Sequence, residues 1–279
     1  MTERNPLILA KEIAVLDLHS HGRFLFGIGA GWNREETTIM GGDFDHRWTQ
    51  AREAVMALKA LWTQEEAEFH GRYYDFPPVY CYPKPAQKPH PPVWVPGTGS
   101  PETIEWAAQH RYTYAAFLVP LDASVRLYDQ YREHASEAGY EATADHFAYM
   151  VCCVCADTDE QAQAVGKHYL WRMGHPLRGP GEYWAPPGYL GQRQPLQPGG
   201  VLRHGRKPMY AMTYEELQEA YHLVVGSPQT VLEKLGHMHE RLGFGALLLE
   251  AQAGAMPHAD TMRSLELLGR EVIPQVHKL

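Results

Sequence analysis

The order of apolar and polar positions predicts short strands that alternate with helices. In the stretch Pro6–His19, Leu9, Ile13 and Leu16 recur at helical spacing, and Pro6 suits a first helical position. The same spacing predicts helices at Trp48–Trp62, Pro101–His110, Ala123–Ala138, Asp159–Arg172, Val231–Leu242 and Ala259–Val276. Short apolar runs predict strands at Arg23–Ala30, Pro92–Pro96, Tyr112–Val119, His146–Ala156 and Gly245–Glu250. This alternation implies βαβ units and parallel strand pairing.

Two stretches interrupt the alternation. Gly71–Pro92 holds seven prolines in 22 residues, and the pattern predicts no strand or helix within it. Gly174–Pro208 holds seven prolines and eight glycines in 35 residues. A long loop inside an α/β chain is either a surface excursion without function or a binding loop. The second stretch contains the aromatic residues Tyr183, Trp184 and Tyr189. They favour the interpretation of this stretch as a lid that covers a flat ligand.

Composition narrows the classes of partner. The chain has 279 residues, with 25 basic and 33 acidic side chains, so its net charge is −8. An acidic chain without a basic stripe is a poor nucleic-acid binder. The mean hydropathy of −0.40 and the lack of a long apolar run argue against a membrane-spanning helix. Met1–Pro6 carries no signal-peptide pattern, so we expect a cytoplasmic protein.

The four cysteines are interpreted as packing residues. Cys152, Cys153 and Cys155 fall in the apolar run Tyr149–Ala156, and Cys81 stands apart from them. Alternation along a strand would turn neighbouring thiols to opposite faces, and no histidine stands at ligand spacing. We therefore expect neither a disulfide framework nor a metal site.

Gly-Ser-Pro occurs twice between an apolar run and a predicted helix, in Val95–Thr103 and in Val224–Thr230. Serine is a good N-cap, proline fits the first turn, and the start of a helix attracts phosphate. Either segment could bind a phosphate or could simply begin a helix. Glu102 counts against the first, because it adds negative charge there.

A second glycine-rich segment lies at Phe26–Asn33. Gly27, Gly29 and Gly31 alternate, which is not the dinucleotide-binding spacing. Alternate glycines at the end of a strand allow a planar ring to lie against the backbone, or they allow tight packing under a helix. Both interpretations stay open.

The chain has no motif for a nucleophile, a zinc protease or a P-loop. Glu250 and Gln252 follow the last predicted strand, where barrel enzymes place catalytic groups. A single acid at a strand end is also a common structural cap. The catalytic residues therefore stay unassigned.

Several motifs resemble those of the luciferase-like monooxygenases, the family of bacterial luciferase, alkanesulfonate monooxygenase and the F420-dependent reductases. The segment Asn5–Asn33 contains the core Leu16-Asp17-x-x-Ser20-x-Gly22-Arg23, and it departs from the family at His19 and His21. Further matches are Leu61-Trp62-Thr63, Phe69–Tyr74, Pro83-x-Pro85-x-Gln87, Pro91–Trp94, Gly226–Val231 and Ser264–Pro274. The resemblance covers nearly the whole chain and is weakest across Gly174–Pro208.

This resemblance implies an α/β fold, the (β/α)8 TIM barrel of the bacterial luciferase type. The run Arg23–Ala30 then corresponds to strand four, and the five predicted strands become strands four to eight. Strands one to three would lie before Met1. We expect one domain over residues 1–279, with a lid-like insertion at about 174–208. A barrel open in this way should expose apolar surface and self-associate.

The resemblance also implies a flavin site. Ser100 corresponds to the serine that meets the flavin phosphate in luciferase, with Thr98 and Gly99 beside it and Gly29 and Gly31 against the ring. This favours the first Gly-Ser-Pro segment, and Ser227 in the second is the alternative. Luciferase has an arginine where this chain has Ala30, so the phosphate of FMN would lose a charged partner. This weakens the assignment of FMN as the cofactor and leaves F420 as an alternative.

The expected function is oxygenation of a small organic substrate by O2 and reduced FMN, which a separate flavin reductase would supply. With F420 the reaction would be hydride transfer without oxygen. A third possibility is a flavin-binding protein without catalysis. A homo-oligomer is expected, and neither nucleic acid nor membrane is expected as a partner.

Overall fold

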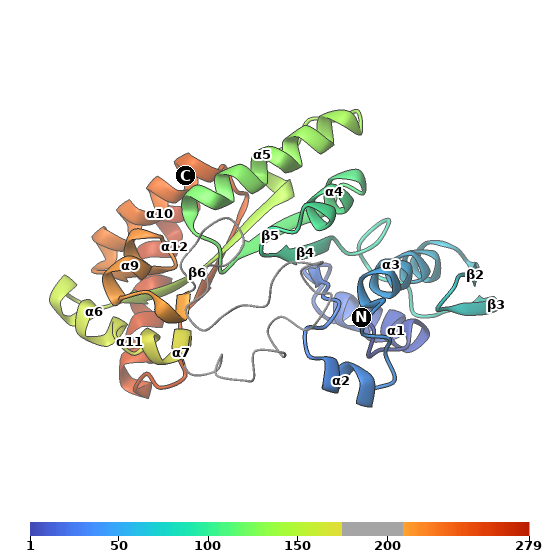
Figure 1. Ribbon diagram of the computed structural model, residues 1–279, viewed down its shortest axis with the longest axis horizontal. Helices are drawn as coiled ribbons and strands as arrows, with labels where there is room; N and C mark the ends of the chain where they lie inside the picture. Colours follow the sequence, from blue (N-terminus) through green and yellow to red (C-terminus); the bar gives the residue numbers. More distant parts are fainter. Residues whose placement is uncertain (175–208, 279) are drawn as a thin grey trace. The chain divides into compact units, whose positions relative to one another are not determined.

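The computed structural model describes residues 1–174 and 209–278 (Figure 1). The chain divides into two compact units, Met1–Pro96 and the described residues from Gly97 onward. Both units combine helices with strands, as the alternating pattern predicts. The assignment of residues 1–279 to a single domain remains a prediction.

The first unit is built around a tryptophan. Trp62 lies edge-on to Phe26 with 5.6 Å between the ring centroids, and its indole N–H donates to the Ala10 carbonyl at 3.0 Å. These residues come from the two long helices and the first strand, so the contacts join all three. The elements of this unit are α1 (Pro6–His19), β1 (Phe26–Gly27), α2 (Arg34–Ile39), α3 (Arg47–Thr63), β2 (Glu66–His70), β3 (Asp75–Tyr80) and β4 (Val93–Gly97).

The first strand is shorter than predicted. β1 pairs in parallel with β4, and Phe26 lies opposite Val93. One further hydrogen bond, from the Ile28 amide to the Trp94 carbonyl at 2.9 Å, continues the ladder past Gly27. The predicted strand Arg23–Ala30 is therefore wrong at both ends, although its centre is confirmed.

The second strand of a hairpin lies in the proline-rich stretch, and the apolar pattern predicts neither strand of this hairpin. β2 and β3 pair antiparallel, and the register shifts between Ala67 and Phe69. The shift places Pro77 and Pro78 opposite the single residue Glu68. A bulge is a position where prolines are tolerated, because ladder hydrogen bonds are already interrupted there.

Two residues of the family motifs hold each other inside the first unit. The fully buried Asp17 carboxylate accepts hydrogen bonds from the Gln87 amide at 2.9 Å and from the Gln87 side chain at 2.7 Å. The same side chain also donates to the Phe24 carbonyl at 2.7 Å. Gln87 thus links α1, the chain before β1 and the proline-rich stretch.

The second unit contains a parallel sheet in which β6 pairs with three other strands. Tyr114 lies opposite Phe147, Cys152 lies opposite Glu250, and Cys155 lies opposite Gly226. The elements of this unit are α4 (Pro101–Gln109), β5 (Thr113–Phe117), α5 (Leu121–Glu137), η1 (Ala144–His146), β6 (Phe147–Cys155), α6 (Asp159–Gly166), α7 (Tyr169–Gly174), η2 (Met209–Ala211), α9 (Tyr214–Glu219), β7 (Leu223–Gly226), α10 (Pro228–Leu242), β8 (Ala246–Glu250), α11 (His258–Leu267), η3 (Leu268–Val272) and α12 (Ile273–Val276). The predicted βαβ organisation is confirmed. The eight-stranded barrel, and the absence of strands one to three, remain predictions.

The two faces of β6 pack against different helices. Cys152 and Val154 belong to an apolar cluster with Tyr169 of α7 and Leu217 of α9. On the opposite face, the Phe147 ring stacks on Tyr128 of α5 with 4.5 Å between centroids. The long central strand is therefore covered on both sides, as its burial at every residue except the partly buried Met150 requires.

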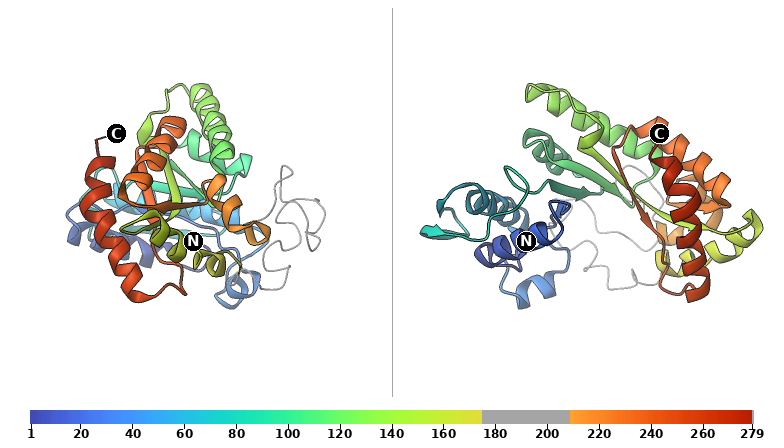
Figure 2. Two further views of the ribbon diagram at one scale, coloured as in Figure 1. Left: turned by 90° about the vertical axis from the view of Figure 1, so that its left-hand side faces the viewer. Right: turned by 180° about the vertical axis from the view of Figure 1, so that it is seen from behind.

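The last helical segment is continuous from His258 to Val276, with a π-helical turn at Leu268–Val272 (Figure 2). The prediction of one helix over Ala259–Val276 is confirmed in extent, and the wider turn inside it is not foreseen by the apolar spacing.

Candidate functional site

The turn between β4 and α4 is the first candidate site. It consists of Gly97, Thr98, Gly99 and Ser100, and α4 begins at Pro101. Gly99 has φ of 109°, a conformation that side chains rarely allow, and an added Cβ would lie 3.3 Å from Leu127 Cδ2. The turn therefore requires glycine at this position, both for its backbone angle and for its close packing.

Ser100 occupies the N-cap position, but its side chain does not cap the helix. The half-buried hydroxyl donates to Glu102 Oε2 at 2.6 Å, and no capping hydrogen bond reaches the backbone. Ser100 therefore stands at the predicted N-cap position, but the prediction that its side chain caps the helix is wrong. Glu102 is exposed and lies one residue into the helix, so the carboxylate takes the favourable position for negative charge at the start of α4. A ligand phosphate would have to displace Glu102 from the hydroxyl.

The second Gly-Ser-Pro segment begins α10, and a carboxylate side chain of the protein already binds there. Asp159 Oδ1 accepts from the Ser227 amide at 2.6 Å, and Oδ2 accepts from the Thr230 hydroxyl at 3.0 Å. The amide hydrogen bond from Ser227 is the main reason why the Asp159 pKa lies below its usual value. This arrangement counts against Ser227 as the phosphate site, because its backbone amide is already occupied, whereas Glu102 at α4 accepts from the Ser100 hydroxyl.

The glycine-rich segment after β1 is open at one glycine and packed at another. Gly29 is exposed, and an added Cβ would meet no atom within 4 Å. Gly31 has φ of 87°, and its added Cβ would lie 3.1 Å from the Thr37 hydroxyl oxygen. Gly29 therefore leaves room for a flat ligand, whereas Gly31 serves the local packing. Both belong to the first unit, whereas Thr98, Gly99 and Ser100 belong to the second.

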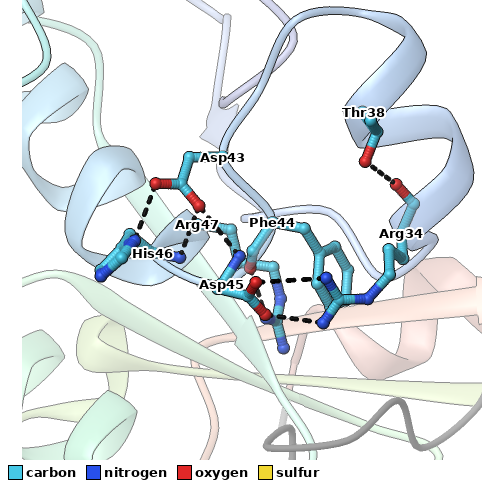
Figure 3. Close-up of polar contacts among 7 residues, drawn as sticks. All are labelled: Arg34, Thr38, Asp43, Phe44, Asp45, His46 and Arg47. Atoms are coloured by element: carbon cyan, nitrogen blue, oxygen red, sulfur yellow. Dashed lines mark hydrogen bonds and ion pairs between the residues drawn. The ribbon is translucent and has the colours of Figure 1, made fainter.

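A polar cluster follows β1 in the connection to α3, and sequence analysis misses it (Figure 3). Arg34 forms two hydrogen bonds to Asp45, at 2.6 Å and 3.2 Å, and its guanidinium carbon lies 4.4 Å from the Phe44 ring centroid. His46 Nδ1 lies 2.7 Å from Asp43 Oδ2. The sequence signal is the run Asp43–Arg47, in which acids alternate with basic residues and an aromatic. These contacts brace the connection between α2 and α3.

Glu250 at the end of β8 is held by three residues of the second unit. Its Oε1 accepts from Arg172 Nε at 2.7 Å, its Oε2 lies 3.6 Å from the Cys152 thiol, and its carbonyl accepts from the Tyr169 hydroxyl. The Arg172 and Glu250 side chains are 28% and 22% exposed. Glu250 therefore joins β8 to α7, and the structure gives it a structural role first.

Gln252, the other candidate at this strand end, holds its own loop. Its carbonyl oxygen accepts from the Gly254 amide at 2.6 Å, and its side-chain nitrogen donates to the Thr261 hydroxyl at 3.2 Å. Both the oxygen and the nitrogen of the side-chain amide are therefore hydrogen-bonded within this loop, and Gln252 stabilises the connection from β8 to α11.

The cysteines are buried and protonated. Burial is the largest cause that raises the pKa of the Cys152 and Cys153 thiols, and it raises that of Cys155 to about 12. Within residues 1–174 and 209–278, no group of three or more histidine, cysteine or acidic side chains is placed to hold a metal. The expectation of no metal site remains a prediction. The proposed lid residues Tyr183, Trp184 and Tyr189 lie outside the described residues.

A surface pocket of about 380 Å³ lies beside the end of β6, lined by Asp157, Gln161 and Arg263 among others. Arg263 donates to both carboxylate oxygens of Asp157 and, at 2.9 Å, to Glu266. Two of the charged side chains that line the pocket, Asp157 and Arg263, are therefore paired with each other.

Comparison with known proteins identifies the family of this chain. The sequence model of the luciferase-like monooxygenases matches residues 1–244. An uncharacterised protein of Mycobacterium tuberculosis is 45% identical over 107 residues, which are 38% of this chain and 38% of that protein. The FMNH2-dependent dimethylsulfone monooxygenase of Pseudomonas putida is 28% identical over 166 residues, covering 58% of this chain and 44% of the enzyme. The aligned regions thus span less than half of these two relatives.

A solved structure shows the fold. The oxygenating constituent of 3,6-diketocamphane monooxygenase from Pseudomonas putida, solved in complex with FMN, superimposes with a TM-score of 0.73 at 24% identity. The match covers 98% of this chain and 77% of that one. Among the described residues, no helix has both the length and the apolar character needed to cross a bilayer. Because the family model spans most of the sequence and the fold agrees, the chain belongs to the luciferase-like monooxygenase family.

Proposed function

We propose that this protein is a flavin-dependent monooxygenase that uses reduced FMN and O2 on a small organic substrate. The observation that carries the proposal is the turn between β4 and α4, where a glycine with positive φ and a serine hydroxyl stand at the start of a nine-residue helix. Membership of a family with FMN-dependent monooxygenases supports it.

The residues of this turn fit a phosphate monoester. The Ser100 hydroxyl can rotate from Glu102 to a phosphate oxygen, and the dipole of α4 favours negative charge at that end. The equivalent place on α10 is taken by Asp159. Gly29, in the first unit, remains a separate candidate for contact with a flat ring, whereas the packing of Gly31 argues for a supporting role.

Bound flavin would supply the reducing power and the reaction with O2, and this chain would supply the binding site. Ser100 would fix the phosphate end of the cofactor, and the glycines Gly97 and Gly99 would let the backbone approach it closely. The proposed architecture is a (β/α)8 barrel in which β1, β4, β5, β6 and β8 are strands four to eight. A separate reductase that delivers reduced FMN, and self-association of the chain, belong to the same proposal.

The experiment compares flavins that differ only in the phosphate. FMN and riboflavin are titrated into wild type, Ser100→Ala and Ser227→Ala, the last being a matched control from the second Gly-Ser-Pro segment. Ser100→Ala should weaken FMN binding about 5-fold to 150-fold, the scale of about 1–3 kcal/mol for a hydrogen bond to a charged group. Riboflavin binding to Ser100→Ala and FMN binding to Ser227→Ala should stay as in wild type.

Three results would contradict the proposal. Equal losses for FMN and riboflavin would make Ser100 a structural residue only, and a loss in Ser227→Ala alone would move the phosphate to α10. Tight binding of F420 with no binding of FMN would favour the hydride-transfer alternative. Oxygen uptake with a flavin reductase then separates an oxygenase from a flavin-binding protein without catalysis.

A further inference from the structure

The second unit buries several tyrosines, and most of them donate to a backbone carbonyl. The Tyr128 hydroxyl donates to Ala148 at 2.6 Å, that of Tyr131 donates to Tyr112 at 2.8 Å, and that of Tyr149 donates to Val119 at 2.7 Å. Each of these phenols is therefore a fixed link between a helix or a strand and its neighbour. This is the usual state of a buried polar group.

Tyr114 is different. Its side chain is fully buried on β5, and its hydroxyl donates to no acceptor among the described residues. Burial raises the pKa of this phenol, so it stays protonated and keeps a proton to donate. A buried donor without an acceptor is costly, and such a group requires a physical explanation.

The place of Tyr114 suggests that explanation. An added Cβ at Gly97 would lie 2.7 Å from Tyr114 Cε2 and 2.8 Å from its hydroxyl oxygen. The phenol therefore fills the space that a side chain at Gly97 would need. The Gly99 backbone amide lies on the oxygen side of the phenol, where a hydrogen bond from it lowers the pKa against the larger effect of burial, and it offers the O–H no acceptor. The hydroxyl thus lies directly beneath the turn that leads to Ser100.

We propose that the Tyr114 hydroxyl is a specificity-determining donor that binds the ligand phosphate from beneath the Gly97–Ser100 turn. This inference rests on the proposed function, because it takes the ligand there to be a flavin with a phosphate monoester. Gly97 and Gly99 place no side chain between the turn and the phenol, so a small shift of the backbone would bring a phosphate oxygen within reach. A phosphate oxygen above the turn would supply the acceptor that the Tyr114 hydroxyl does not have among the described residues.

The proposal predicts opposite effects of one substitution on stability and on binding. Tyr114→Phe keeps the ring that packs against Gly97 and removes the unsatisfied hydroxyl. The ligand-free variant should melt at the same temperature as wild type or higher. Its Kd for FMN should rise about 5-fold to 150-fold, and its Kd for riboflavin should not change.

Tyr131→Phe is the matched control. It removes a hydroxyl that donates to the Tyr112 carbonyl, before the start of β5, and so it lies away from the turn. This variant should melt below wild type and should bind FMN as wild type does. The pair separates loss of a ligand contact from general loosening of the unit.

The outcomes separate this inference from the proposed function. If Ser100→Ala weakens FMN binding and Tyr114→Phe does not, the role of Tyr114 is overturned and the function stands. If wild type binds FMN no more tightly than riboflavin, both are overturned. A measurement without a variant uses inorganic phosphate on wild type, which should shift the tyrosine absorption to longer wavelength relative to added chloride. A spectrum that phosphate does not change overturns the Tyr114 contact.

Discussion

The Asp159 carboxylate lies 2.6 Å from the Ser227 amide and so occupies the start of α10. The two residues are 68 positions apart in the chain. The same Gly-Ser-Pro sequence at α4 has a glutamate of its own helix beside the serine hydroxyl, at 2.6 Å. One local sequence therefore begins two helices with different surroundings: the acid at α4 belongs to the same helix, whereas the acid at α10 comes from α6.

The Asp159 contact predicts a pH dependence of stability. Its pKa is lowered in the folded protein, so its contribution is present above the usual value of 3.8 and is lost as pH falls through the lower folded value. Asp159→Asn should therefore be less stable than wild type at neutral pH, and the two should converge in acid. Urea unfolding across a pH series measures this. A difference that persists unchanged to about pH 2 would show that the charge plays no part.

The long elements could be predicted from the sequence because their signals are local. Helix α1 spans Pro6–His19 as predicted, since proline at the first position and apolar spacing act within a few residues. Helix α10 starts three residues before the predicted Val231, at the proline after Ser227. Its apolar face alone gives no mark for that start.

The elements that were missed depend on distant partners. Strand β3 contains Pro77 and Pro78, and it is a strand only because β2 accommodates them with a bulge. Strand β7 is four residues long and is defined by its pairing with the end of β6. The same reason applies to the site. The turn at Ser100 could be found by its pattern, but the position of Tyr114 beneath it depends on the sheet.

The link between Asp17 and Gln87 predicts a large loss of stability from a small change. Gln87→Ala removes both side-chain hydrogen bonds, to Asp17 and to Phe24, and leaves a fully buried carboxylate with fewer donors. The free energy of unfolding should fall by about 1–3 kcal/mol or more, the cost of an unsatisfied buried group. Urea denaturation of Gln87→Ala beside the exposed control Gln64→Ala measures it. Equal stabilities would show that the link is dispensable.

Glu53 should be essential for the hairpin. Its carboxylate accepts backbone hydrogen bonds from Arg72 at 3.1 Å, Tyr73 at 2.7 Å and Tyr74 at 2.8 Å. An added Cβ at Gly71 would lie 2.2 Å from Glu53 Oε1, so the loop closes tightly around the carboxylate. Glu53→Ala should lower the free energy of unfolding by about 1–3 kcal/mol, and Glu65→Ala, an exposed neighbour, should not. Hydrogen exchange of the Tyr73 and Tyr74 amides should rise in the first variant only.

The buried thiols should resist labelling in the folded protein. All four cysteines are buried, and burial raises the pKa values of the thiols on β6. The reactive thiolate is therefore scarce and inaccessible. A disulfide exchange reagent at mildly alkaline pH should label none of the four quickly in native protein and all of them in denaturant. Rapid native labelling of one site would indicate local opening, and the labelled cysteine would identify where.

The pair Arg172 and Glu250 should contribute more than an ion pair on the surface, and the chain contains a matched comparison. Arg172 and Glu250 are 28% and 22% exposed and are 2.7 Å apart, whereas Arg241 and Asp122 are 42% and 76% exposed and are 2.8 Å apart. Arg172→Met leaves the Glu250 carboxylate half-buried beside the Cys152 thiol, which is a weak donor. The free energy of unfolding should fall by about 1–3 kcal/mol. Arg241→Met should change it by less than about 1 kcal/mol, because solvent screens the exposed pair. Urea unfolding in low and high salt compares the two, and the effect of Arg172→Met should depend less on salt.

If both variants lose the same free energy with the same salt dependence, Glu250 is held by the surrounding fold and not by Arg172. The Glu250 carboxylate would then be available for a role at the end of β8.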